Sequence, residues 1–299
     1  MRTEVIKADT IDAAAERILD ELKNTRSREN AIYFDGWDGL GASAVLRAVA
    51  QRLAPKEQTR PPGLEFEQVI HIDSSKWESR RAVQREISEQ LKLPGWVRKM
   101  FDKQDEDDDF SGMDQGSRTE IAEVTAEIHR SMQSRRFLLV LHNGSSEEID
   151  TFNLGLSLYG YLSSKMLWTF QGRFRLDPKL RDKVVAKNTT DVLLSASRSK
   201  RDPQDLWSYL LLEEAKDVSC KHGLDPATVA ECYSYMLERS YMSQNIIDYE
   251  WTLHAMPFTP LHAPSFWIFD GIIQQGQGIL ECWQVAHALQ STPRNEILY

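Results

Sequence analysis

Short apolar runs alternate with segments of helical periodicity along the first two thirds of the chain. Residues 11–22 place apolar side chains three and four positions apart, which predicts an amphipathic helix. Residues 137–141 form a continuous apolar run, typical of a strand buried on both faces of a parallel sheet. Further strands are expected at 31–34, 66–72, 166–170 and 192–196, and further helices at 43–53, 79–91 and 121–132. The alternation predicts an α/β fold with a parallel sheet of about five strands and helices on both faces.

The strand pattern stops near residue 200, and helical periodicity continues alone. Helices are expected at 206–218 and 226–237, the second with Asp225 as its N-cap and Pro226 at its first position. The final stretch is rich in aromatic residues and predicts a small helical module. Three parts are therefore expected: an N-terminal helix and linker at 1–28, a sheet domain at 29–205, and a smaller helical domain at 206–299.

Composition and charge narrow the class of protein. The chain has 36 Lys and Arg against 45 Asp and Glu, a net charge of −9 that disfavours nucleic-acid binding. Its 3 cysteines show no C-x-x-C spacing, so neither a disulfide framework nor a structural zinc site is expected. The sequence has no signal-peptide core and no apolar stretch of about 18 residues, which predicts a cytoplasmic protein that is not integral to a membrane. The acidic run 102–109 is expected to be a solvated loop, because neighbouring like charges repel each other.

The candidate chemistry lies in a glycine-rich loop that follows the strand 31–34. Its residues are Gly36, Trp37, Asp38, Gly39, Leu40, Gly41, Ala42 and Ser43. The spacing G-x-x-x-x-G-x-[ST] and the strand-to-helix context are those of a phosphate-binding loop, in which backbone N–H groups and a helix N-terminus face the phosphate. Ala42 stands where such loops carry Lys, so the full positive charge is missing. The alternative is a glycine turn that only connects the strand to the helix.

A second motif follows the strand 137–141. His142 and Asn143 occupy positions where nucleotide-hydrolysing proteins carry carboxylates that hold magnesium. Magnesium prefers oxygen ligands, and neither side chain supplies a charged one. We therefore expect no bound magnesium, no catalytic residue and no appreciable ATP hydrolysis. An alternative role for His142 is that of a polar cap at the strand end.

Three segments, in the same order, resemble the NB-ARC module of plant disease-resistance receptors with leucine-rich repeats. Residues 36–43 resemble its loop G-x-G-G-x-G-K-[TS], and residues 135–143 resemble its acidic strand L-L-V-L-D-D. Residues 267–273, W-I-F-D-G-I-I, resemble the segment W-x-x-x-G-[FI]-I of its winged-helix part. Residues 164–173 are similar to its fourth strand, with Thr169 and Arg173 as the nearest equivalents of a Thr-Thr-Arg sensor.

This resemblance extends over roughly residues 29–283. It implies a P-loop NTPase-like sheet domain, a truncated winged-helix-like part, and weak binding of ADP, or of ATP, by residues 36–43 and Arg173. It also implies a role in plant defence through contacts with other immune-receptor or signalling proteins, in a chain that can form oligomers. Asp38 replaces a loop glycine of the family, which favours the alternative of a scaffold protein that keeps the fold with its nucleotide site empty.

Overall fold

The computed structural model describes most of the chain. The described residues are 2–23, 29–37, 39–54, 63–73, 77, 79–143, 150–158, 164–170, 190–199, 203–246, 262–273 and 278–291. Asp38 and Arg173, two of the candidate site residues, lie outside them. Within the described residues, no helix combines the length and the apolar character that crossing a bilayer requires.

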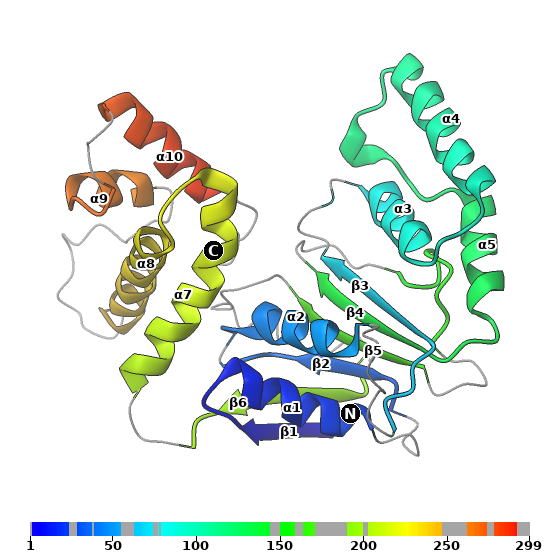
Figure 1. The fold of residues 1–299 in the computed structure, drawn as a ribbon. Helices are drawn as coiled ribbons and strands as arrows, with labels where there is room; N and C mark the ends of the chain where they lie inside the picture. The colour runs from blue at the N-terminus through cyan, green and yellow to red at the C-terminus, as the bar shows by residue number, and fades with distance from the viewer. Residues whose placement is uncertain are drawn as a thin grey trace.

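A six-stranded parallel sheet forms the centre of the fold (Figure 1). Its order is β1-β6-β2-β5-β4-β3, so that β2 and β5 lie in the middle. The strands are β1 (Arg2–Lys7), β2 (Ala31–Phe34), β3 (Gln68–Asp73), β4 (Phe137–Asn143), β5 (Lys165–Phe170) and β6 (Val192–Ser197). The five strands expected from the sequence are present, and β1 is a sixth. Because β1 pairs with β6 along its whole length, the first part of the chain contributes to the sheet instead of leading in to it.

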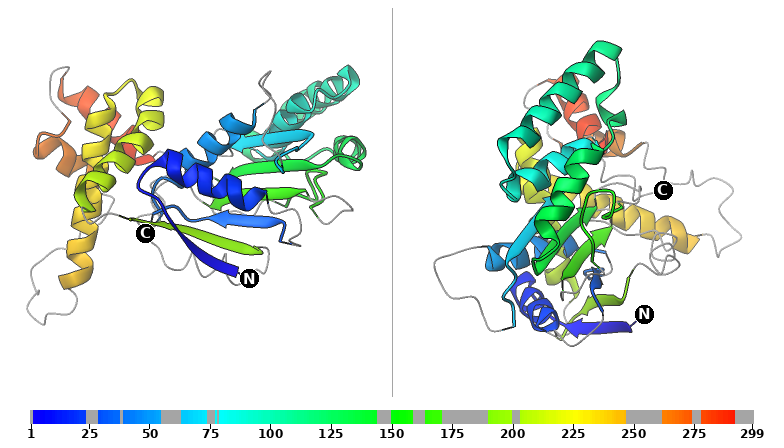
Figure 2. Two further views of the ribbon diagram at one scale, coloured as in Figure 1. Left: turned by 60° about the horizontal axis from the view of Figure 1, so that its bottom comes forward. Right: turned by 90° about the vertical axis from the view of Figure 1, so that its right-hand side faces the viewer.

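Helices cover both faces of this sheet, and two separate apolar cores lie between the strands and the helices. One core joins Ile32, Leu138 and Leu167 to α1 (Ile11–Leu22) and α2 (Ala42–Leu53). Figure 2 shows these two helices on one side of the strands. The other core joins Ile70 and Leu139 to α3 (Arg80–Gln90), α4 (Gly95–Ser111) and α5 (Ala122–Met132). The α/β class predicted from the sequence is therefore confirmed.

A helical part follows the last strand and stands at one end of the molecule (Figure 1). It consists of α7 (Pro203–His222), α8 (Pro226–Ile246), α9 (Ala263–Phe269) and α10 (Ile279–Ser291). Its central side chain is Trp267, which is fully buried and donates its indole N–H to the carbonyl oxygen of Cys232 at 3.0 Å. The Cys232 thiol is buried too, and burial raises its pKa to about 12, which makes it an inert core group.

The acidic run contradicts the sequence prediction of a loop. Residues 102–109 lie inside α4, which ends at Gly112 with a φ of 72°. Arg81 of α3 forms ion pairs with Asp105 and with the buried Asp108, and Arg118 forms one with Asp109. These arginines neutralise the repulsion within the run, so a helix forms where the local charge pattern predicted solvated coil.

Candidate functional site

The glycine loop leaves the carboxyl end of β2 and leads directly into α2. In open α/β sheets this edge is the usual place for ligands. Asp35 donates its backbone N–H to the Leu194 carbonyl at 2.8 Å, and Ala196 donates to the Gly36 carbonyl at 2.8 Å. The start of the loop is therefore attached to β6. Gly41 is the N-cap residue of α2. Its φ of 72° lies in the left-handed region, which favours glycine at this position.

The loop closes on itself through backbone hydrogen bonds. Trp37 donates its N–H to the Leu40 carbonyl at 2.9 Å, and Leu40 donates back to the Trp37 carbonyl at 3.0 Å. Gly39 donates its N–H to the Asp35 carbonyl at 3.1 Å. A phosphate-binding loop needs such N–H groups to face its ligand. Here three of them are used inside the loop.

Close packing holds the same closed shape. A β-carbon added to Gly36 would lie 2.1 Å from the carbonyl oxygen of Leu40, and the φ of Gly36 is +70°. The oxygen thus lies directly against the glycine backbone. Its partial negative charge faces into the turn, where a bound phosphate would need donors instead.

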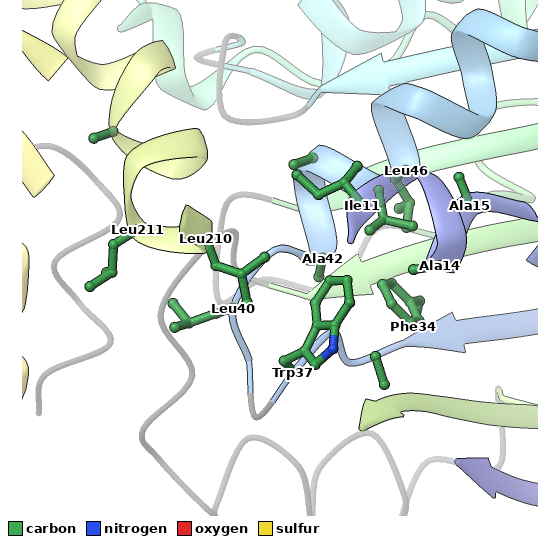
Figure 3. Packing of buried hydrophobic residues seen from close by; sticks show 14 of the residues in the cluster. Ile11, Ala14, Ala15, Phe34, Trp37, Leu40, Ala42, Leu46, Leu210 and Leu211 are labelled. Atoms are coloured by element: carbon green, nitrogen blue, oxygen red, sulfur yellow. The ribbon is translucent and has the colours of Figure 1, made fainter. Parts of the chain in front are cut away.

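Apolar side chains then bury the loop (Figure 3). Trp37 is 4% exposed and Leu40 is 2% exposed, and the Trp37 indole donates to the Ala8 carbonyl at 2.9 Å. A β-carbon on Gly41 would lie 2.8 Å from the nearest side-chain atom of Leu210 in α7 and 3.0 Å from the Trp37 ring. Ala42, at the position of the missing Lys, is buried in the same core. The loop therefore connects the sheet to α1 and α7.

The neighbouring strands bring further polar residues to the same edge. His142 of β4 lies in register with Asp73 of β3 on one side and with Thr169 of β5 on the other. His142 and Thr169 are both buried. The Nε2 atoms of His142 and His71 are 3.0 Å apart, a distance that fits a hydrogen bond between one ring N–H and one unprotonated ring nitrogen. His142 is thus part of a pair of side chains and not an isolated strand cap.

Asn143 ends β4, and its backbone lies in register with Phe170. His71 could not be identified from the sequence, because no motif links it to His142. The two residues come together only through the register of β3 and β4. Among the described residues, no group of three or more His, Cys, Asp or Glu side chains is arranged to hold a metal ion.

A buried lysine elsewhere does not compensate for Ala42. Lys165 is the first residue of β5, at the opposite end of that strand from Thr169. Its Nζ donates to the Glu29 carbonyl at 3.0 Å, and burial lowers the pKa of this amine. Lys165 therefore belongs to the amino edge of the sheet, away from the glycine loop.

Comparison with known proteins adds little to this geometry. No protein-family model matches the chain, and a search of curated proteins finds no match in sequence. The similar solved structures include one described as the crystal structure of a DNA replication initiation factor, with 12% sequence identity and a TM-score of 0.34. The match covers 96% of this chain and 88% of that one. The structure itself shows the fold class, which is a six-stranded parallel sheet with helices on both faces, followed by a helical part.

Proposed function

We propose that this protein acts through protein contacts on a P-loop NTPase-like fold and does not turn over nucleotide. The observation that carries the proposal is the closed glycine loop, in which Trp37 and Leu40 are hydrogen-bonded to each other and buried. On this proposal the loop is a structural turn that joins the sheet to α1 and α7. The fold is kept for the surfaces that it presents.

The free-energy cost of opening the glycine loop favours weak nucleotide binding at most. Opening the loop would break three backbone hydrogen bonds, each worth about 0.5–1.5 kcal/mol, and would expose two large apolar side chains. The Lys that Ala42 replaces would have added a charge-assisted contact of about 1.5–3 kcal/mol. Both effects act against phosphate binding. Hydrolysis would in addition require charge neutralisation that His142 does not supply.

The resemblance to the NB-ARC module supplies the biological setting of the proposal. The three similar segments keep their order along the chain, which supports a role in plant defence. The partners would then be other immune-receptor or signalling proteins in the cytoplasm.

A second candidate is weak ADP binding, and one observation favours it. The helix α2 begins at the carboxyl edge of the sheet, and no side chain caps its N-terminus. The first-turn N–H groups of a helix attract anions, and Ser43 lies in this turn. A nucleotide bound only by this helix end would lack the loop contacts, and its affinity would be low.

The experiment that separates the two candidates uses the whole chain as purified from cells. One sample of the protein is denatured, and the supernatant is analysed for ADP and ATP. A second, untreated sample is titrated with ADP and with Mg-ATP by calorimetry. The proposal expects no released nucleotide, no heat of binding at micromolar ligand and no phosphate release. Stoichiometric ADP in the supernatant would establish the second candidate, and phosphate release that depends on Ser43 would refute both.

A further inference from the structure

Helix α4 carries an exposed aromatic tip. The helix stands at the opposite end of the molecule from α7–α10, and its C-terminal turn points outward in both Figure 1 and Figure 2. Phe110, in that turn, is 96% exposed, and Met113 just beyond it is 43% exposed. An aromatic side chain with almost no contacts contributes nothing to folding. It is, however, the residue type that most often anchors a protein interface.

A rigid base holds this tip in place. Arg81 of α3 is buried and pairs with Asp105 and Asp108, which fixes the C-terminal half of α4. Arg118 is also buried and pairs with Asp109, one residue before Phe110. Gly112 ends the helix, its N–H donating to the Asp109 carbonyl at 3.1 Å. Because the backbone is already fixed, binding through Phe110 would cost little backbone freedom.

The surroundings of Phe110 are negatively charged. Glu106, Asp107 and Asp114 are exposed, and none of them forms an ion pair with a Lys or Arg within the described part of the chain. The C-terminus of a helix carries about half a negative charge of its own, which adds to these carboxylates. The whole chain is also acidic, with a net charge of −9, which adds to the negative electrostatic potential around the tip. We call Glu106, Asp107, Phe110, Met113 and Asp114 the acidic aromatic tip.

We propose that the acidic aromatic tip is a docking site for a basic protein surface that has an apolar recess for Phe110. The aromatic ring requires an apolar contact, and the carboxylates around it require cations. Together they select Lys- or Arg-rich protein surfaces and repel acidic ones. The same charges oppose approach to nucleic acid or to anionic lipid, since both carry negative charge. This site lies on the α3–α5 side of the sheet and is independent of the glycine loop.

A synthetic probe tests the chemistry of this surface. The full-length chain is titrated with a fluorescent amphipathic peptide of lysine and leucine, and with a matched peptide of glutamate and leucine. Binding of the lysine peptide only is expected. Phe110→Ala should weaken this binding by about fivefold or more, the loss typical of an aromatic anchor. Phe152→Ala removes another exposed phenylalanine, 69% exposed, and serves as the matched control.

The charge contribution is tested in the same assay. Glu106→Gln should weaken binding of the lysine peptide and reduce its dependence on salt, whereas Glu231→Gln, an exposed residue on α8, should leave both unchanged. Circular dichroism of each variant checks that the fold is retained; both substituted carboxylates are exposed and both phenylalanines lie on the surface.

Four results would overturn the proposal. The first is equal binding of the lysine peptide by wild type and Phe110→Ala. The second is equal binding of the glutamate peptide. The third is binding to phosphatidylcholine–phosphatidylserine vesicles that depends on Phe110, which would make the tip a membrane contact. The fourth is a concentration-dependent dimer that Phe110→Ala abolishes, which would make a second copy of the chain the occupant.

Discussion

The indole N–H of Trp37 donates a hydrogen bond to the carbonyl oxygen of Ala8 across 2.9 Å. This bond joins the glycine loop to the turn between β1 and α1, two segments that lie 29 residues apart in the chain. The loop is therefore held by its own backbone bonds, by Leu210 on α7 and by the N-terminal segment. A ligand that opens the loop would have to disturb all three.

Substitution of Gly36 tests whether the closed loop exists in solution. Gly36→Ala places a β-carbon 2.1 Å from the Leu40 carbonyl and adds strain at a φ of +70°, so a loss of more than about 2 kcal/mol in unfolding free energy is expected. Gly112→Ala is the matched control, because its φ is +72° and nothing lies within 4 Å of the new carbon. Urea denaturation measures both. Equal costs in the two variants would mean that the loop is open.

Trp267 is expected to be the main source of stability in the helical part. Trp267→Ala removes a fully buried side chain and its hydrogen bond to the Cys232 carbonyl, with an expected cost of about 3–5 kcal/mol. Its near neighbour Phe269 is 77% exposed, so Phe269→Ala should change stability by less than about 0.5 kcal/mol. Thermal unfolding followed by tryptophan fluorescence and circular dichroism compares them. A small effect of Trp267→Ala would contradict the burial and the hydrogen bond described for this side chain.

The ion pairs that hold α4 predict a specific loss of stability in acid. Hydrogen bonds from Gln104 and Arg81 lower the pKa of Asp108 below its ordinary value of 3.8. A lowered pKa in the folded state means that the stabilisation is complete above pH 3.8 and is lost as the pH falls through the folded pKa. Asp108→Asn should therefore weaken the dependence of stability on pH from about pH 5 to about pH 2.

The control for this measurement is Asp107→Asn, whose carboxylate is exposed and forms no ion pair among the described residues. The stability of Asp107→Asn should depend on pH in the same way as that of the wild type. Denaturant midpoints measured at each pH give the comparison. If Asp108→Asn and Asp107→Asn had the same slope, the pairing of Asp108 with Arg81 would not contribute to stability.

Lys165 predicts a rise of stability with pH of the same sign, but in the alkaline range. Burial lowers the pKa of its amine below 10.5, so the unfolded chain binds more protons than the folded one between the two pKa values. Stability should then rise with pH over that window. Lys165→Met should remove the rise, whereas Lys103→Met, at an exposed position on α4, should keep it. Urea midpoints between about pH 7 and pH 10 give the result, and an unchanged slope in Lys165→Met would contradict the prediction.

Strands could be predicted from the sequence where consecutive apolar residues mark them. Residues 137–141 form a continuous apolar run, and the structure places β4 there, buried on both sides. β1 could not be predicted in this way, because Arg2, Glu4 and Lys7 interrupt its apolar positions. It forms because β6, far along the chain, offers a parallel partner. The helix α4 was missed for a related reason, since Arg81 and Arg118 neutralise its acids from other segments.

The candidate site shows the same limit. The glycine spacing at 36–43 correctly predicted a loop that leads from a strand into a helix. The spacing could not reveal that the Leu40 carbonyl turns toward Gly36, or that Leu210 from a distant helix covers Gly41. The contact between His71 and His142 depends on the register of β3 and β4, which a single sequence does not specify.

The position of β1 also decides where the chain can be cut. A recombinant fragment that starts at residue 29, the natural choice from the glycine-loop motif, would lack both β1 and α1. The backbone of β6 would then become a bare sheet edge, and the apolar surface of α2 that α1 now covers would face water. Such a fragment should aggregate during expression, whereas one that begins at residue 2 should remain in solution.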